Sequence, residues 1–351
     1  MRFCIDIDSG DAISGWLAPD NPAVSPRITV AVPGRDDVEI DGMVIRRDVV
    51  DAGYHMTGAC GFLVTADMVA DLPRLMDIEI REAETRLPIY RRFAPGRDLR
   101  KKLFLFDCSV LPQRRLLDRI GGRFSLTYCN TERNGAETTL ACIVNPSAQS
   151  AFFCGRSSVT RYDDVLTDQG FLRAALMRDP FEELAERLYF LNYIAQEGGD
   201  AAATYAHGLR SLLDFASDLP FKDPRGVAVA FRAASETQRR ELMSPMTRVF
   251  GCDVDEPPRH ANVTRALQKL AGFDVVGLRA NFSMFRDLLA GVLGEDLLEE
   301  EEPVAYPAVR ALADMLSGIG MVNDLLAEDL ALYAHVTDAI DEGLRQPVDA
   351  A

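Results

Sequence analysis

An apolar segment that ends in an Arg-Asp-Pro turn and continues as a long amphipathic helix most constrains the fold of this chain. Residues 171–177 (FLRAALM) are almost wholly apolar, which is typical of a strand buried in a parallel sheet. Asp179 and Pro180 suit the cap and the first position of a helix. Apolar residues then recur with helical 3-4-3 spacing at Phe181, Leu184, Leu188 and Leu191. The segment predicts a strand-turn-helix unit of an α/β domain, with the helix ending at Gly198-Gly199.

The turn itself, Arg178-Asp179-Pro180, allows two interpretations. An arginine at a strand end can grip an anion in two places, beside the unpaired N–H groups that begin a helix. Asp179 followed by Glu182 also forms a capping-box pattern, which needs no ligand. Glu182 and Glu183 complement the positive helix end themselves. Local sequence favours the structural turn and leaves the anion site open.

The turn resembles the 3′-phosphate loop of sulfotransferases, where a strand ending in Arg-Asp-Pro precedes a helix. Two later segments resemble that family in the same order. Residues 272–294 resemble its late strand, Val-Gly and helix segment, and residues 323–340 resemble its closing helix, with an Asp-x-x-x-Tyr pattern at Asp329 and Tyr333. The resemblance implies that the donor is 3′-phosphoadenylyl sulfate and that Arg178 binds its 3′-phosphate.

The same resemblance implies an earlier loop that holds the 5′-phosphosulfate. Our candidate lies between strand-like residues 124–129 and a helix that runs through Ile143. Its donor-binding residues are Arg133, Gly135, Thr138 and Thr139, in a spacing close to the family's Lys/Arg-x-Gly-x-Thr. Glu137 is an extra residue in that spacing, and it is our candidate catalytic base.

Two departures from the family affect this interpretation. Glu186 stands where the family usually has a serine, and the separation of Arg133 from Arg178 is shorter than usual. An alternative first loop lies within residues 102–121, which form another strand-to-helix unit without a glycine before Gly121. The polar residues of this alternative are Ser109, Arg114 and Arg115.

The first hundred residues have a different pattern. Short apolar runs alternate with Gly, Pro, Asn and Asp at intervals typical of an antiparallel β-sandwich, and no helix is expected between them. Residues 10–90 also resemble the Gly-Trp β-domain appended to bacterial glycosyltransferases and related surface-polysaccharide enzymes. The residues that carry this resemblance are Gly15-Trp16-Leu17-Ala18-Pro19, Arg47-Asp48-Val49, Gly53, Gly58 and Gly61-Phe62. It implies that the partner is a glycan acceptor or a glycan-assembly protein.

We therefore expect a two-domain α+β chain. Residues 1–95 would form a β-sandwich accessory domain, and residues 96–351 a sulfotransferase-like three-layer α/β domain with a mostly parallel sheet and a helical C-terminal part. Amphipathic patterns predict helices at residues 205–217 and 236–249, and a helical pair within residues 307–344. Trp16 is expected to pack rather than to stack on a sugar. His55 and Cys60 lack a second pair of ligands, so no metal is expected.

The amino-acid composition and charge disfavour some classes of binding partner. Hydrophobic residues make up 48% of the chain and charged residues 26%, as in globular proteins, and the net charge of −16 disfavours nucleic acid and anionic membranes. No apolar run reaches membrane-spanning length, no secretion signal begins the chain, and the seven cysteines are scattered. We therefore expect a cytoplasmic protein. Six basic residues and one acid between Arg91 and Lys102 form either a solvated linker or a patch for an anionic polysaccharide.

These features together predict sulfuryl transfer from 3′-phosphoadenylyl sulfate to a hydroxyl of a bacterial cell-surface glycan. The alternative is a non-catalytic glycan- or protein-binding scaffold with a degenerate sulfotransferase fold. Glu137, Glu186 and the lack of a histidine between Arg133 and Arg178 favour the alternative. The sequence does not predict the oligomeric state.

Overall fold

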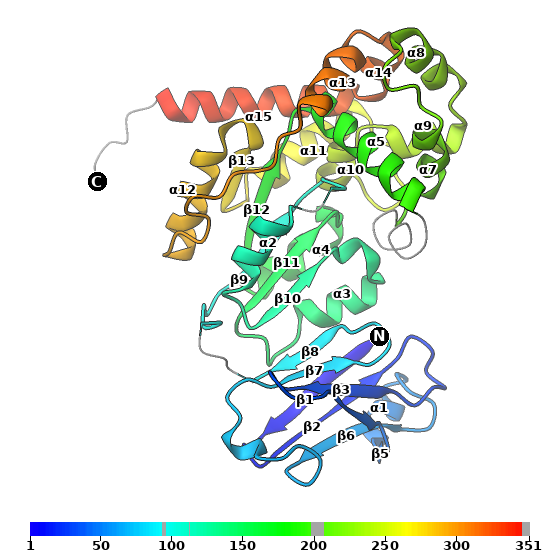
Figure 1. Cartoon of the computed structure of the whole chain (residues 1–351). Coiled ribbons are helices and arrows are strands. Elements are labelled where there is room, and N and C mark those ends of the chain that lie inside the picture. Colours follow the sequence, from blue (N-terminus) through cyan, green and yellow to red (C-terminus); the bar gives the residue numbers. More distant parts are fainter. Residues whose placement is uncertain (93–95, 112, 198–206, 346–351) are drawn as a thin grey trace. The chain divides into compact units, whose positions relative to one another are not determined.

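The computed structural model describes residues 1–92, 96–111, 113–197 and 207–345 (Figure 1). The chain divides into two compact units, each built from separate stretches of sequence. The first unit comprises Met1–Phe104, Asp118–Phe153 and Val165–Phe171. The second comprises Leu105–Leu117, Cys154–Asp164 and Leu172–Ala351. Neither unit is therefore a single continuous segment of the chain.

Two four-stranded antiparallel sheets occupy the described N-terminal part of the first unit, in the orders β1-β2-β6-β5 and β4-β3-β7-β8. Their strands are β1 (Arg2–Asp8), β2 (Ala12–Ala18), β3 (Arg27–Ala31), β4 (Val38–Asp41), β5 (Val44–Ile45), β6 (Ala59–Thr65), β7 (Glu79–Glu82) and β8 (Pro88–Arg91). Successive strand residues face opposite sides, so burial alternates along β2, where Ile13 and Leu17 are fully buried. The prediction of antiparallel strands here is confirmed.

A short helix, α1 (Arg47–Asp51), lies between β5 and β6, where the sequence analysis expected no helix. Its five residues are too few to show a helical period. Val49 of α1 is buried with Ala18 and Cys60, and Trp16 packs against this cluster. Trp16 also stacks on Tyr54, with ring centroids 6.3 Å apart. A 3-10 turn, η1 (Leu72–Arg74), follows β6.

A five-stranded parallel sheet with helices follows, in the order β10-β11-β9-β12-β13. Its strands are β9 (Lys102–Phe106), β10 (Leu126–Cys129), β11 (Ala151–Gly155), β12 (Leu172–Met177) and β13 (Val275–Leu278). The helices and 3-10 turns around them are α2 (Arg114–Gly121), η2 (Thr131–Arg133), α3 (Ala136–Ile143), α4 (Val159–Asp168), α5 (Pro180–Glu197), η3 (Arg279–Asn281) and α12 (Phe282–Leu293). The apolar run of residues 171–177 thus forms β12 and leads into α5, as predicted; Gly198 and Gly199 lie outside the described residues.

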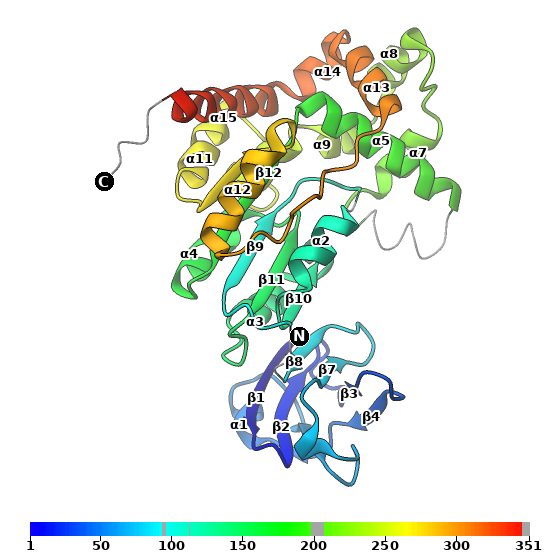
Figure 2. The same cartoon turned by 60° about the vertical axis from the view of Figure 1, so that its left-hand side comes forward.

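The rest of the second unit is helical. Its helices are α7 (Arg210–Ser217), α8 (Pro224–Ala233), α9 (Glu236–Leu242), α10 (Pro245–Gly251), α11 (His260–Leu270), α13 (Pro307–Ser317), α14 (Gly320–Leu325) and α15 (Ala327–Arg345). In Figures 1 and 2, α5, α7, α8, α13 and α14 lie together, and their apolar faces form one core that includes Leu188, Leu212, Phe231 and Leu316. No helix among the described residues combines the length and the apolar character needed to cross a membrane.

The prediction of a single helix over residues 236–249 is wrong. The helix is broken between α9 and α10 at Ser244, whose φ of 36° is left-handed, followed by Pro245. A proline lacks the N–H that would continue the helix, although it suits the first position of a new one. The break therefore follows from local chemistry that the amphipathic pattern does not register.

Candidate functional site

A cavity in the second unit lies at the carboxyl ends of β12 and β13. Met177 pairs with Leu278 in the parallel register, so Arg178 and Arg279, the next residues, leave the sheet at the same edge. The central strand, β9, is the first of the five in sequence, and the chain adds β10 and β11 on one side before β12 and β13 on the other. Open α/β sheets bind ligands beyond the carboxyl ends of their strands, at the point where the strand order reverses. Here that point lies between β9 and β12, and the cavity lies beside it, at the same carboxyl ends.

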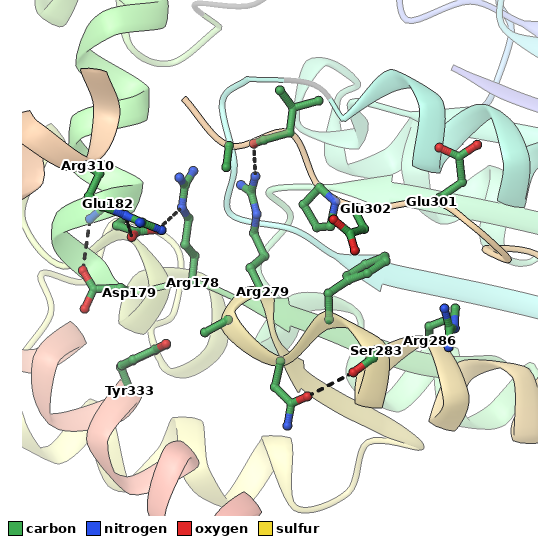
Figure 3. A pocket seen from close by; sticks show the side chains of 16 residues that line it. Arg178, Asp179, Glu182, Arg279, Ser283, Arg286, Glu301, Glu302, Arg310 and Tyr333 are labelled. Atoms are coloured by element: carbon green, nitrogen blue, oxygen red, sulfur yellow. Dashed lines mark hydrogen bonds and ion pairs between the residues drawn. The ribbon is translucent and has the colours of Figure 1, made fainter. Parts of the chain in front are cut away.

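The cavity has a volume of ≈ 520 Å³ (Figure 3). Four arginines line it, and they come from three parts of the second unit: Arg178, Arg279, Arg286 and Arg310. Carboxylates line it as well, at Asp179, Glu182, Glu301 and Glu302. The cavity is therefore highly charged, with both signs close together, and its electrostatics depend on which arginines are already paired.

The two arginines at the strand ends share one buried carboxylate. Arg178 Nη1 lies 2.5 Å from Glu186 Oε2, and Arg279 Nη1 lies 3.2 Å from Glu186 Oε1. Both arginines are 7% exposed and Glu186 is 2% exposed. Burial opposes the charge of Arg178, but Glu186 outweighs it and raises the pKa of the guanidinium. Glu186 therefore compensates part of the positive charge that the two buried arginines place at the strand ends.

The turn before α5 is a helix cap. Asp179 Oδ1 accepts hydrogen bonds from the N–H groups of Phe181 (2.9 Å) and Glu182 (3.1 Å), which are among the unpaired donors of the first helical turn. The carboxylate of Glu182 accepts from Arg178 Nε at 3.2 Å. The turn therefore has the structural role of a helix cap. Arg178 also lines the cavity, where it lies beside Arg279 (Figure 3).

Arg286 and Arg310 are the more exposed cations of the cavity. Arg286 is 31% exposed and pairs with Asp287 (3.1 Å) and Asp296 (3.6 Å). Arg310 is 76% exposed and lies 4.0 Å from Glu182. Exposed pairs of this kind exchange partners at little free-energy cost, so these two arginines are better placed than Arg178 to meet an incoming anion.

An extended segment connects α12 and α13 (Figure 2). Its residues 301–305 line one side of the cavity. The N–H of Val304 donates to Gln113 Oε1 and its carbonyl accepts from Arg279 Nη2, both at 3.2 Å. Glu302 and Val304 also line a second cavity of ≈ 450 Å³. The second cavity is lined further by Leu111, Gln113, Arg114, Arg115, Leu116, Phe190, Tyr193, Ile194 and Tyr306. The segment therefore separates two neighbouring cavities.

The alternative first loop from the sequence analysis, which follows β9, contributes to this second cavity. Arg114 and Arg115 line it, whereas the N–H of Ser109 donates to the carboxylate of Asp107 at 2.9 Å. β9 is the central strand of the sheet, while β10, which precedes the first-choice loop, is an edge strand. The strand order thus favours the loop after β9 for ligand binding.

Several buried ionisable side chains lie near the ends of β9 and β12. Arg187 Nη2 donates to Glu183 Oε1 and to the carbonyl of Cys108, both at 3.2 Å. Burial raises the pKa of Glu183 to about 7 against the opposing charge of Arg187, and burial also raises the pKa of Asp107 and of the Cys108 thiol. Perturbed carboxyl groups are common at functional sites, and this cluster lies at the switch point between β9 and β12 rather than in the cavity beside β12 and β13.

The loop after β10 lies in the first unit, with different surroundings. Glu137 is 69% exposed and pairs with Arg2 at 3.2 Å. Thr138 Oγ1 accepts a hydrogen bond of 2.9 Å from the amino group of Met1, and Thr139 is 1% exposed. Gly135 caps α3, and a Cβ there would contact nothing within 4 Å.

The remaining residue of that loop, Arg133, ends η2. Arg133, Gly135, Glu137, Thr138 and Thr139 therefore belong to the first unit and Arg178 to the second. The structure does not bring the two sets into one described site. Their common use by one donor stays a prediction.

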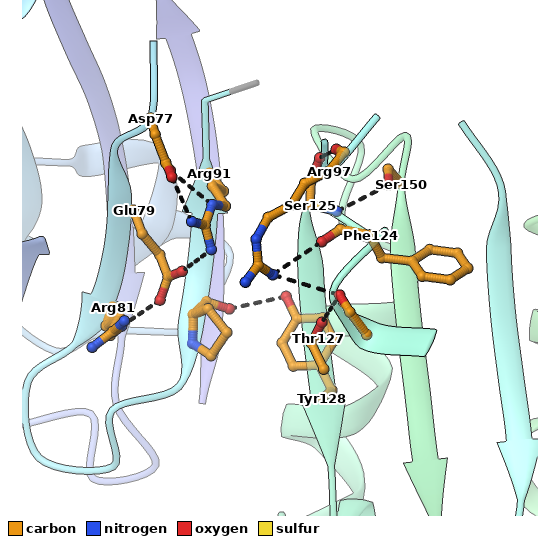
Figure 4. Close-up of polar contacts among 12 residues, drawn as sticks. Asp77, Glu79, Arg81, Arg91, Arg97, Phe124, Ser125, Thr127, Tyr128 and Ser150 are labelled. Atoms are coloured by element: carbon orange, nitrogen blue, oxygen red, sulfur yellow. Dashed lines mark hydrogen bonds and ion pairs between the residues drawn. The ribbon is translucent and has the colours of Figure 1, made fainter. Parts of the chain in front are cut away.

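The basic stretch that begins at Arg91 has structural partners in the first unit (Figure 4). Arg91 pairs with Asp77 (2.8 Å) and Glu79 (2.7 Å), and Arg92 pairs with Asp8 (2.6 Å). Arg97 donates to the carbonyls of Gly121 and Phe124, while the Tyr128 hydroxyl donates to the carbonyl of Pro88 at 2.9 Å. These contacts favour a structural role for the arginines over a polysaccharide patch.

Two other candidates from the sequence have structural roles. Asp329 is 1% exposed and accepts from the N–H groups of Met246 (3.0 Å) and Thr247 (2.6 Å), so it caps α10. His55 is buried, with Nε2 3.0 Å from the carbonyl of Val24, and its Nδ1 accepts from the N–H of Gly58. Across residues 1–92, 96–111, 113–197 and 207–345, no group of three or more His, Cys, Asp or Glu is arranged to hold a metal ion.

The sequence analysis missed Arg279, Arg286, Arg310 and Glu302 as site residues. For Arg279 a signal was present, because it follows an apolar strand directly, as Arg178 does. The three segments that resemble sulfotransferases all contribute to the cavity, through Arg178, through residues 279–286 and through Tyr333. The chain matches no protein-family model, and no curated protein is similar to it in sequence. The functional argument therefore rests on the geometry of the cavity.

Proposed function

We propose that this chain is a sulfotransferase-like protein that transfers a sulfuryl group from 3′-phosphoadenylyl sulfate to a hydroxyl of a bacterial cell-surface glycan, on the cytoplasmic side of the membrane. One observation carries the proposal: three segments that resemble the family separately, far apart in sequence, line a single cavity. The cavity holds four arginines at the edge of the sheet where α/β proteins bind ligands. In this proposal it receives the donor, including both the 3′-phosphate and the reacting 5′-phosphosulfate.

The second cavity would receive the acceptor. Its wall includes Tyr193 and Tyr306, which are 56% and 47% exposed, and aromatic rings that are partly exposed suit the apolar face of a sugar. Glu302 lines both cavities, so its carboxylate is placed to take a proton between a donor and an acceptor. Glu137 stays our candidate base from the sequence, and Glu302 is the candidate from the geometry.

The reaction needs little covalent chemistry from the protein. The acceptor oxygen attacks sulfur, the bond from sulfur to the bridging phosphate oxygen breaks, and that oxygen leaves with the bonding electrons as adenosine 3′,5′-bisphosphate. A carboxylate takes the proton of the hydroxyl. Cations must neutralise the charge that grows on the leaving phosphate, and Arg286 and Arg310 are the accessible cations for this role.

Residues 1–95, which lie in the first unit, would assist as an accessory domain. We propose that its two antiparallel sheets form a β-sandwich, that the five-stranded sheet belongs to a three-layer α/β domain, and that the sandwich engages the glycan or a glycan-assembly protein. The support is its resemblance over residues 10–90 and the stacking of the half-buried Trp16 on the exposed Tyr54.

A thermal-shift titration with adenosine 3′,5′-bisphosphate tests the donor site, because a ligand that binds only the folded state raises Tm. We expect a saturable shift that is at least halved in Arg286→Gln and in Arg310→Gln. Arg225→Gln, at an exposed position of α8 outside the cavity, is the matched control and should keep the full shift. Absence of any shift at millimolar ligand, or an equal shift in all variants, would refute the proposed donor site.

A second candidate function is the non-catalytic scaffold. The observation that favours it is the pairing of Glu186 with both Arg178 and Arg279, which leaves little positive charge for a donor phosphate at the strand ends. Transfer of radiolabelled sulfate from 3′-phosphoadenylyl sulfate to an acidic or neutral polysaccharide distinguishes the two. Labelled product supports the enzyme, and donor binding without product over a panel of polysaccharides supports the scaffold.

A further inference from the structure

A smaller cavity in the second unit, of ≈ 150 Å³, is separate from the two described above and is lined by three arginines. Arg156 follows β11, Arg187 lies on α5 and Arg248 lies on α10. The other residues that line it are Cys108, Gly208, Leu209, Glu241, Pro245 and Val249. Three arginines from three distant segments thus line one space. It is large enough for a single anion, a water molecule bound to that anion and a few further atoms.

Arg248 has no carboxylate partner within the part of the chain that the structure describes. Its Nη2 donates to the backbone carbonyls of Arg240 and Met243. Burial, together with the positive charges of Arg240 and Arg187, lowers the pKa of Arg248. An anion in the cavity would offset both effects, because it would add negative charge beside the guanidinium group.

Arg187 adds a buried donor without an acceptor. Its side chain is 3% exposed, and its Nε has no hydrogen-bond partner within the described residues, although its Nη2 is bonded to Glu183 and to the carbonyl of Cys108. Buried guanidinium donors are rarely left unpaired, and an arginine can hold an oxyanion through Nε and Nη together.

The carboxylates nearby are already engaged. Glu183 pairs with Arg187, and the Ser211 hydroxyl donates to Glu241 Oε2 at 2.7 Å. Asp329 accepts from the first N–H groups of α10. The guanidinium donors of this cavity therefore require a negatively charged acceptor with several oxygen atoms.

We propose that this cavity is an oxyanion site that binds one tetrahedral group, sulfate or phosphate, through Arg156, Arg187 and Arg248. The inference does not depend on the proposed donor site, since no residue lines both cavities. The volume admits a single such group, either as the free ion or as the terminal group of an ester whose remainder leaves past Gly208, which is exposed.

Isothermal titration with inorganic sulfate tests this site. We expect saturable binding that weakens at least tenfold in Arg248→Gln and less in Arg248→Lys, because lysine keeps the charge but loses the planar donor fork. Arg225→Gln should bind as the wild type does. Sulfate binding that is absent in the wild type, or unchanged in a folded Arg248→Gln, would overturn the proposal.

Two further measurements locate the ion and separate this site from the donor site. Selenate soaked into crystals should give an anomalous peak among Arg156, Arg187 and Arg248, and a peak found only beside Arg286 and Arg310 would overturn the assignment. Arg248→Gln should leave the adenosine 3′,5′-bisphosphate shift unchanged, so failure of one site is distinct from failure of the other.

Glucose 6-sulfate, titrated in parallel with sulfate, shows whether the bound group is a free ion or part of an ester. Binding of glucose 6-sulfate that requires Arg248 supports an ester group, and binding of sulfate alone supports a free ion.

Discussion

The sequence analysis expected the turn after β12 and the loop after β10 to serve one donor, yet the charges beside the turn are buried and those of the loop are exposed. In the turn, Arg178 and Glu186 are 7% and 2% exposed and compensate each other. In the loop, Arg2 and Glu137 are 42% and 69% exposed and form a surface pair. A buried charge requires a partner, whereas an exposed one does not. Similar strand-to-helix motifs therefore constrain the chain very differently, depending on the position of the strand in the sheet.

Glu186→Gln should have the largest effect, because it leaves two buried arginines without their shared carboxylate. We expect the free energy of unfolding, measured by urea denaturation, to fall by about 3–5 kcal/mol, the usual cost of breaking a buried ion pair from one side. Glu182→Gln is the control, since Glu182 is 33% exposed and pairs with Arg178 alone at the strand end. Equal losses in the two variants would contradict the distinction between buried and exposed pairs.

The free energy of unfolding should depend on pH through the titration of the Glu183 carboxyl group. Burial raises its pKa from 4.5 in the unfolded chain to about 7 in the folded one, so the folded state binds the extra proton between these values. The free energy of unfolding should therefore fall as pH rises from about 4.5 to 7, by roughly 3 kcal/mol at about 1.4 kcal/mol per pKa unit. Urea denaturation across that range measures it. Glu183→Gln should reduce the slope, and the remaining slope should come from Asp329, whose pKa burial raises to about 6. A wild type that gains stability over this window would show the assignment to be wrong.

Asp179→Ala should have an intermediate effect, because it removes the cap of α5 but no buried charge. We expect a loss of about 1 kcal/mol in the free energy of unfolding, typical of a lost N-cap. Asp179→Asn retains a side-chain oxygen that accepts the same N–H groups and should lose much less. A similar loss in both variants would mean that the charge, rather than the hydrogen bonds, stabilises the turn.

Glu137→Gln should have the smallest effect on stability. Its pair with Arg2 is exposed on both sides, and such pairs contribute between about 0 and 1 kcal/mol. Urea denaturation that differs from the wild type by more than this would place Glu137 in a more constrained setting. Because folding is preserved, the same variant also tests the candidate base: labelled sulfate transfer unchanged in Glu137→Gln but lost in Glu302→Gln would assign the proton to Glu302.

The parts of this structure that the sequence predicts are those with local signals. The antiparallel strands follow alternation and turn residues, and the start of α5 follows from Asp179 and Pro180. The pairing of Glu186 with Arg279 joins residues 93 apart in sequence, and no local pattern encodes it. It depends on which strands lie side by side, and the order β10-β11-β9-β12-β13 is a property of the whole sheet. For the same reason, the four arginines of the cavity become one set only in the folded chain.

The cap that Asp329 provides for α10 has a consequence for how the chain folds during synthesis. The N–H groups of Met246 and Thr247 donate to the carboxylate of Asp329, which lies 83 and 82 residues later in the chain. At about 5–20 residues per second, a ribosome takes several seconds or more to supply it. During that interval the first turn of α10 lacks its cap, although Arg248, which lies on α10, can already donate to the carbonyls of Arg240 and Met243. The helix that carries this arginine of the small cavity is therefore fully capped only after Asp329 has been added to the chain.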